Sequence, residues 1–192
     1  MSNAVSLERT ENALVIRLTR PEIRNPLSVE VVEYLTTVVS NLDRGVLRVV
    51  FTGSEGVFAA GADLREIDKV TVDEAKEFAE RGQRLMRAVE ALPDTVAAIN
   101  GFCFGGALDL ALSCKRRIAV ATAEFCHPGV GLGIITGWGG TQRLPCLVGE
   151  AAALEMFMTA RRVSAEEALR IGLVDTIADD PVELALKQTL YV

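Results

Sequence analysis

Two short, largely apolar runs, residues 47–52 and 95–100, constrain the fold of this 192-residue chain more than any other feature. Runs of this length that lack alternation and are bounded by turn residues are typical of strands buried on both faces of a sheet. A helical pattern precedes the first run, from a capping serine at Ser28 to Gly45, and another separates the two runs across residues 72–92. This alternation of strand and helix predicts an α/β fold.

The rest of the chain fits one domain, predicted to span residues 1–192. Residues 5–9 and 13–18 are β-prone and flank a turn, which predicts an opening hairpin. Residues 117–121, 123–126 and 173–177 are further strand candidates, and most of residues 149–192 has helical spacing. A C-terminal helical segment is expected to start at about residues 180–192.

Charge and apolar content exclude several classes of function. The chain has 26 acidic and 20 basic residues, so its net charge of -6 argues against a nucleic-acid surface. No apolar stretch approaches the roughly 20 residues that span a bilayer, and no secretory signal is visible, so we expect a cytoplasmic protein without membrane contact. The four cysteines, Cys103, Cys114, Cys126 and Cys146, have no metal-site spacing, which predicts reduced, largely buried thiols and no bound metal.

Two segments rich in small residues, AAGAD (59–63) and FGGALD (104–109), have the same design. Each follows a predicted buried strand and leads toward helical sequence, so backbone N–H groups at each corner are free to point at a ligand. Two such corners brought together could grip one oxygen atom, as in an oxyanion hole. Either segment alone is explained as well by tight turns or close helix packing, whereas the pair favours the oxyanion hole.

Five segments, in this order, resemble the crotonase family, also called the enoyl-CoA hydratase/isomerase superfamily. They are RPEIRNPLS (20–28), FTGSEGVFAAGADLREI (51–67), AAINGFCFGGALDLALSC (97–114), GLGIITGWGGTQRLPCLVG (131–149) and RRVSAEEALRIGLVD (161–175). The resemblance implies a spiral of repeated ββα units with flanking helices, and a homotrimer or a hexamer. It implies an acyl-CoA thioester as the substrate, with coenzyme A as part of that substrate and no other cofactor. It also implies further helices after Val192, so that the C-terminal helical part of this chain is shortened.

The resemblance also assigns site residues. By position, the two oxyanion N–H donors fall on Ala62 and Gly106. The residues expected to contact the substrate or its coenzyme A are their neighbours Ala60, Gly61, Asp63, Leu64 and Gly105. Arg24 stands where family members often contact the coenzyme A, although a solvated loop arginine is an equally good interpretation.

The hydratases of this family use two glutamates, and neither is present here. One position holds Asp109, three residues after Gly106, and the other holds Gly129, in HPGVGLG. The loss of the second carboxylate argues against simple hydration. Asp109 keeps a carboxylate but has a reach shorter by about 1.5 Å, a displacement that can cost a hundredfold in rate. It is either the acid/base group or a hydrogen-bonding residue in the first turn of a helix.

Three other side chains allow two interpretations. His127, the only histidine, could be an acid/base or substrate-binding group, or a packed residue. Trp138, the only tryptophan, could narrow the acyl pocket or fill the core. Glu66 could turn into the pocket, or lie exposed on a helix.

The sequence therefore predicts an acyl-CoA enzyme of fatty acid metabolism that stabilises a thioester enolate. Hydration, double-bond isomerisation and decarboxylation all pass through that enolate, and a single carboxylate suits the last two better. The alternative is a non-catalytic acyl-CoA-binding or assembly subunit.

Overall fold

The computed structural model describes residues 4–187, and its organising element is a six-stranded sheet. Strands β1 and β2 form the predicted antiparallel hairpin, and every later strand of this sheet runs parallel to its neighbour. In spatial order the strands are β1 (Val5–Arg9), β2 (Ala13–Leu18), β3 (Arg48–Thr52), β5 (Thr95–Ile99), β7 (Arg116–Ala119) and β10 (Thr176–Ile177).

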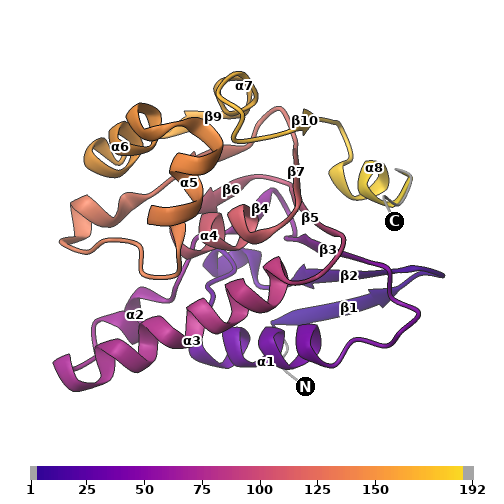
Figure 1. The fold of residues 1–192 in the computed structure, drawn as a ribbon, viewed down its shortest axis with the longest axis horizontal. Coiled ribbons are helices and arrows are strands. Elements are labelled where there is room, and N and C mark those ends of the chain that lie inside the picture. The colour runs from indigo at the N-terminus through magenta and orange to yellow at the C-terminus, as the bar shows by residue number, and fades with distance from the viewer. Residues whose placement is uncertain (1–3, 188–192) are drawn as a thin grey trace.

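The central strands are buried on both faces, as predicted. In β3, Val49 and Phe51 face the main core, whereas Val50 belongs to a smaller apolar cluster on the other face. That cluster includes Ala185 of helix α8 (Pro181–Lys187), which covers this face of the sheet (Figure 1). Helix α8 begins the C-terminal segment expected at residues 180–192; the end of that segment, residues 188–192, lies outside the described residues.

A second, four-stranded sheet was not predicted. Its strands are β4 (Val57–Ala59), β6 (Phe102–Phe104), β8 (Glu124–Cys126) and β9 (Val163–Ser164), and the first three are parallel. The chain passes from a strand of the first sheet to a strand of the second and then into a helix or helical turn, and it does so three times. This is the expected spiral of ββα units. Between each long buried strand and its small-residue corner lies a short strand, β4 or β6, that the sequence did not predict.

Helices fill the space around the two sheets. Helices α1 (Val29–Ser40) and α3 (Val72–Glu90) run side by side along one face, and α4 (Gly106–Ser113) lies in the interior (Figure 1). Ser28 caps α1 as predicted, since its hydroxyl accepts a hydrogen bond from the N–H of Val31. The remaining elements are η1 (Pro21–Ile23), α2 (Leu64–Ile67), η2 (Pro128–Leu132), α5 (Gly140–Val148), α6 (Glu150–Thr159) and α7 (Ala165–Arg170).

The structure also bears on the expectations about the cysteines, the last strand and membrane-spanning helices. Cys103, Cys114 and Cys126 are buried, but Cys146 is exposed on α5, so that prediction is wrong for one thiol of the four. The strand expected over residues 173–177 is limited to its last two residues. Among the helices of residues 4–187, none has the length and apolar content that crossing a membrane requires.

Candidate active site

The two small-residue corners meet in space. Gly61 adopts a φ of 94°, a conformation that favours glycine. A Cβ atom placed on Gly61 would lie 2.8 Å from the carbonyl oxygen of Phe104 and 3.0 Å from the backbone nitrogen of Gly106. A Cβ atom on Gly106 would lie 3.4 Å from the backbone nitrogen of Ala62. The N–H groups of Ala62 and Gly106 are therefore close neighbours, and a residue without a side chain at position 61 permits this approach.

The loop around η1 holds the first corner in place. The N–H of Leu27 donates to the carbonyl oxygen of Gly61 at 2.8 Å, and the N–H of Ala60 donates to that of Arg24 at 2.9 Å. Asn25 is buried, and its side-chain amide donates to the carbonyl oxygen of Val57 at 3.0 Å. The motif RPEIRNPLS thus acts on the corner through its backbone and Asn25.

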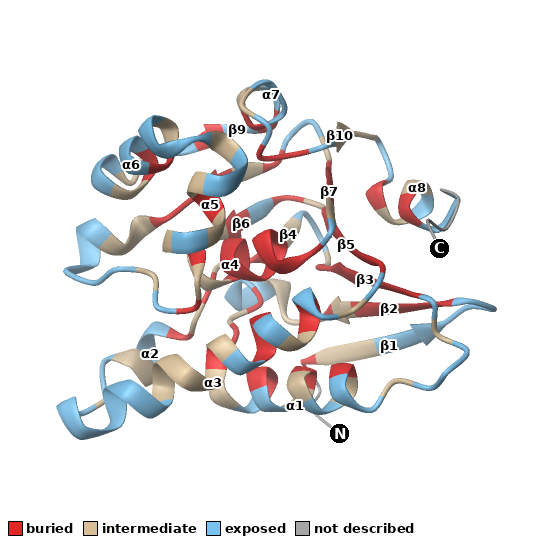
Figure 2. Cartoon of the chain, viewed as in Figure 1, coloured by how far each residue is buried: buried red, intermediate tan, exposed pale blue. Residues whose placement is uncertain are grey.

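The second corner is the start of a buried helix. Gly105 has a φ of 54° and its N–H donates to the carbonyl oxygen of Cys126 at 2.8 Å, which ties the corner to β8. Helix α4 is buried at every position from Ala107 to Ser113 (Figure 2). Within residues 4–187, no hydrogen bond uses the N–H of Ala62 or of Gly106, so both donors are available. Donors at a helix start carry the partial positive charge of the helix dipole.

Asp109 lies one turn into α4 and is fully buried. The hydroxyl of Thr136 donates to its Oδ2 atom, whereas Oδ1 has no partner within the described residues. Burial raises the pKa of Asp109 to about 6, although Thr136, the charge of Arg143 and the backbone N–H groups of Trp138 and Gly140 oppose the shift. A carboxyl group whose pKa is close to neutral can both take up and release a proton.

His127 is the neighbour of Asp109. Its Nε2 atom lies 3.8 Å from Oδ1 of Asp109, and neither ring nitrogen has a hydrogen-bond partner in the described part of the chain. The ring packs on Phe157, with 5.0 Å between the ring centroids. Burial lowers the pKa of His127 to about 4, so the imidazole is neutral at pH 7.

The position of the second family glutamate cannot hold a side chain in this conformation. A Cβ atom on Gly129 would lie 2.5 Å from the carbonyl oxygen of Ile134. The N–H of Ile134 donates to the carbonyl oxygen of Gly129 at 3.0 Å, which fixes this close approach. Asp109 is therefore the carboxylate available beside the corners.

Of the other predicted site residues, Asp63 has a structural role and two are exposed. Asp63 caps α2 and forms an ion pair with Arg65 at 2.6 Å, which holds the pKa of Asp63 below its usual range. The side chains of Arg24 and Leu64 are exposed. Glu66 is half-buried, which corrects the interpretation that it lies exposed: its Oε2 atom accepts from the N–H of Val29 at 2.7 Å and joins α2 to the start of α1.

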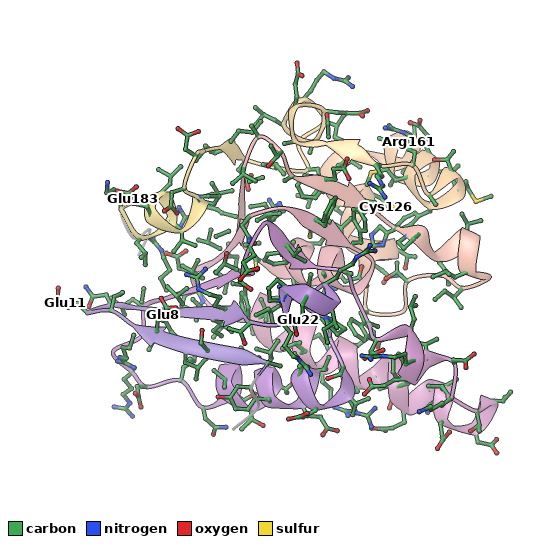
Figure 3. The ribbon with its side chains drawn as sticks, turned by 180° about the vertical axis from the view of Figure 1, so that it is seen from behind. Glu8, Glu11, Glu22, Cys126, Arg161 and Glu183 are labelled. Carbon is green, nitrogen blue, oxygen red and sulfur yellow. The ribbon has the colours of Figure 1, made fainter. Side chains whose placement is uncertain are left out.

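Cys126 is a packed thiol, as predicted. Its Sγ atom is 3.1 Å from the carbonyl oxygen of Ala160, and Figure 3 shows it near Arg161 in the same part of the molecule. Among residues 4–187 there is no group of three or more His, Cys, Asp or Glu side chains that could hold a metal ion.

Sequence reasoning missed Thr136, Gly140 and Gly82. Thr136 and Gly140 surround Asp109: a Cβ atom on Gly140 would lie 2.1 Å from Oδ1 of Asp109. Both lie in the fourth family motif, and that signal could have drawn attention to them. Gly82 lies inside α3 against Trp138, and its position in a helix, where glycine is unfavourable, was a signal too.

Comparisons with a family model and with known relatives point to the same family. The model of the family described as Enoyl-CoA hydratase/isomerase matches residues 8–190. A short-chain-enoyl-CoA hydratase of Clostridium acetobutylicum is 41% identical over 186 residues, which cover 95% of this chain and 71% of the relative. A crotonyl-CoA hydratase of Syntrophomonas wolfei is 42% identical over 186 residues, covering 94% of this chain and 70% of the relative.

Solved structures agree with these relatives. DspI of Pseudomonas aeruginosa superposes with a TM-score of 0.91 at 33% identity, covering 98% of this chain and 82% of that chain. An enoyl-CoA hydratase from Bacillus anthracis superposes with a TM-score of 0.88 at 36% identity, covering 96% of this chain and 73% of that chain.

Proposed function

Because this chain belongs to the enoyl-CoA hydratase/isomerase family, we propose that it binds an acyl-CoA thioester and stabilises the enolate of that thioester. The enolate oxygen lies between the backbone N–H groups of Ala62 and Gly106. The observation that carries the proposal is the contact between the corners: a Cβ atom on Gly61 would lie 3.0 Å from the nitrogen of Gly106. Each such donor is worth about 3 kcal/mol to a transition state that carries charge on oxygen.

Asp109 is the acid/base group of this proposal. Its burial and its pKa of about 6 keep it mostly ionised at pH 7 and still able to accept a proton. A reaction with one proton-transfer group suits the site, because Gly129 has no room for a second carboxylate. We therefore favour isomerisation of a 3-enoyl-CoA to the conjugated 2-enoyl-CoA.

The steps balance with this single group. The Asp109 carboxylate takes a proton from the α-carbon, and the electron pair of that C–H bond moves toward the thioester oxygen held by Ala62 and Gly106. The dienolate then takes the same proton back from Asp109 at its γ-carbon. The double bond moves from the 3 to the 2 position, and Asp109 is again ionised.

Hydration of a 2-enoyl-CoA is the second candidate. The two curated relatives are named as hydratases, which favours this reaction. His127 also brings its unpartnered Nε2 atom to 3.8 Å from Oδ1 of Asp109, so a water molecule has a second polar group beside the carboxylate.

Assays with two thioesters test the proposal. Vinylacetyl-CoA reports isomerisation and crotonyl-CoA reports hydration, and we expect the first to turn over faster. Asp109→Ala should abolish both activities, whereas Asp43→Asn, which removes an exposed carboxylate on a distant loop, should leave both unchanged. Turnover that survives Asp109→Ala would contradict the role of Asp109, and an inert wild-type protein would contradict the enzyme itself.

A further inference from the structure

The indole of Trp138 spans the gap between helices α3 and α4. Trp138 is 5% exposed and lies between two glycines that face opposite edges of its ring. A Cβ atom on Gly82 would lie 2.2 Å from Nε1, and one on Gly106 would lie 2.5 Å from Cε3 and Cζ3. The benzo edge thus touches the corner that carries the oxyanion donor, while the pyrrole edge touches the middle of α3.

A cleft of about 660 Å³ opens beside the indole. Helices α3, α4 and α5 form its walls, and Trp138 is part of its lining. Leu112, Cys146 and Leu147 supply apolar or weakly polar surface, while charge comes from Glu90 and from four basic residues, Arg87, Lys115, Arg117 and Arg143. This space is large enough for a long acyl chain.

We propose that Trp138 is a specificity-determining residue that separates the acyl pocket from this cleft and limits the substrate to short acyl chains. The inference rests on the proposed function, because it takes the thioester oxygen to lie at Ala62 and Gly106. From that point an acyl chain that passes toward Asp109 runs along α4, and the indole stands beside the first residue of that helix.

The packing explains why the indole holds its place. The two glycines leave room for one large flat ring, and Phe78 packs against it with 6.1 Å between ring centroids. A smaller side chain at position 138 would leave the space open from Gly106 to the cleft. Each methylene that then leaves water for apolar surface strengthens binding about fourfold.

Equilibrium binding of two saturated thioesters, butyryl-CoA and decanoyl-CoA, tests the inference without depending on the reaction type. Isothermal titration of the wild type should show tighter binding of butyryl-CoA. Trp138→Leu should raise the affinity for decanoyl-CoA relative to butyryl-CoA by about tenfold or more. Trp138→Phe keeps an aromatic ring and should give an intermediate ratio of the two affinities. It is a second test of the inference if Trp138→Leu does not fold.

The control is Leu147→Ala, which widens the cleft while the indole stays in place, and its affinity ratio should equal that of the wild type. A wild type that binds decanoyl-CoA at least as tightly as butyryl-CoA overturns the inference. Unchanged ratios in both Trp138 variants, with cooperative thermal unfolding, overturn it too and leave the proposed function standing. A wild type that binds neither thioester removes the proposed function and the inference with it.

Discussion

Nε2 of His127 lies 3.8 Å from Oδ1 of Asp109, and neither atom has a hydrogen-bond partner within residues 4–187. Burial moves the two pKa values in opposite directions, with that of His127 falling to about 4 and that of Asp109 rising to about 6. Their usual order is inverted. Between these pH values both side chains are neutral, whereas in water the same pair would be an ion pair.

The stability of the protein should reveal this inversion. The unfolded chain binds a proton at His127 below about pH 6.5, and the folded chain does so only below about pH 4. The contribution of His127 to stability is therefore fully present above pH 6.5 and is lost on acidification. The unfolding free energy of the wild type relative to His127→Gln should rise by roughly 3 kcal/mol from pH 4 to 6.5. Urea unfolding at several pH values measures it, and a constant difference would refute the inversion.

Removing the carboxylate should slow turnover strongly. Asp109→Asn keeps the shape of the side chain but cannot exchange a proton, so kcat should fall by about 10² to 10⁴. In the wild type, kcat/KM should decline below about pH 6, where Asp109 becomes protonated. A pH profile of initial rates measures both, and a wild-type profile that stays flat through pH 6 would show that Asp109 is not the base.

Thr136 should tune the pKa of Asp109. Its hydroxyl donates to Oδ2 and favours the ionised form, so Thr136→Val should raise the pKa of Asp109 further. The acid limb of the kcat/KM profile should then move to higher pH, with less activity at pH 6 and recovery at pH 8. Thr136→Ser retains the hydroxyl and serves as the matched control, and identical profiles for the Val and Ser variants would exclude this role.

A side chain at Gly61 should separate the two corners. Gly61→Ala places a methyl group 3.0 Å from the nitrogen of Gly106 and strains a backbone with a φ of 94°. If the corners form the oxyanion hole, kcat should fall by about 10² to 10³. Gly56→Ala is the control, because Gly56 also has a positive φ but its Cβ would meet nothing within 4 Å. Equal losses in the two variants would mean that backbone strain alone is responsible.

The sequence predicts features that depend on local pattern. Ser28 caps a helix because a serine before an apolar repeat does so in most contexts, and residues 48–52 form a strand around the uninterrupted apolar run 49–51. Strands β4 and β6 are three residues long, too short for any periodicity to show. Their pairing depends on the path of the chain, which places residues 57 and 102 side by side.

The residues that surround Asp109 also could not be predicted from local sequence pattern. The motif positions marked Asp109 and Gly106 as a unit, because they are three residues apart on one helix. Thr136, Gly140 and His127 come from segments beyond that helix, and only tertiary packing brings them to the carboxylate. Glu66 joins α2 to α1 for the same reason, over a separation of 37 residues.

Gly82, Gly106 and Trp138 have a consequence for how relatives of this chain can diverge. Because the indole leaves no room for a Cβ atom on either glycine, a larger residue at position 82 or 106 requires a smaller one at position 138. A lineage that replaces the tryptophan frees both helices to change, whereas one that keeps it must keep the glycines. The three positions should therefore covary, and acyl-chain preference should change together with the packing of α3 on α4.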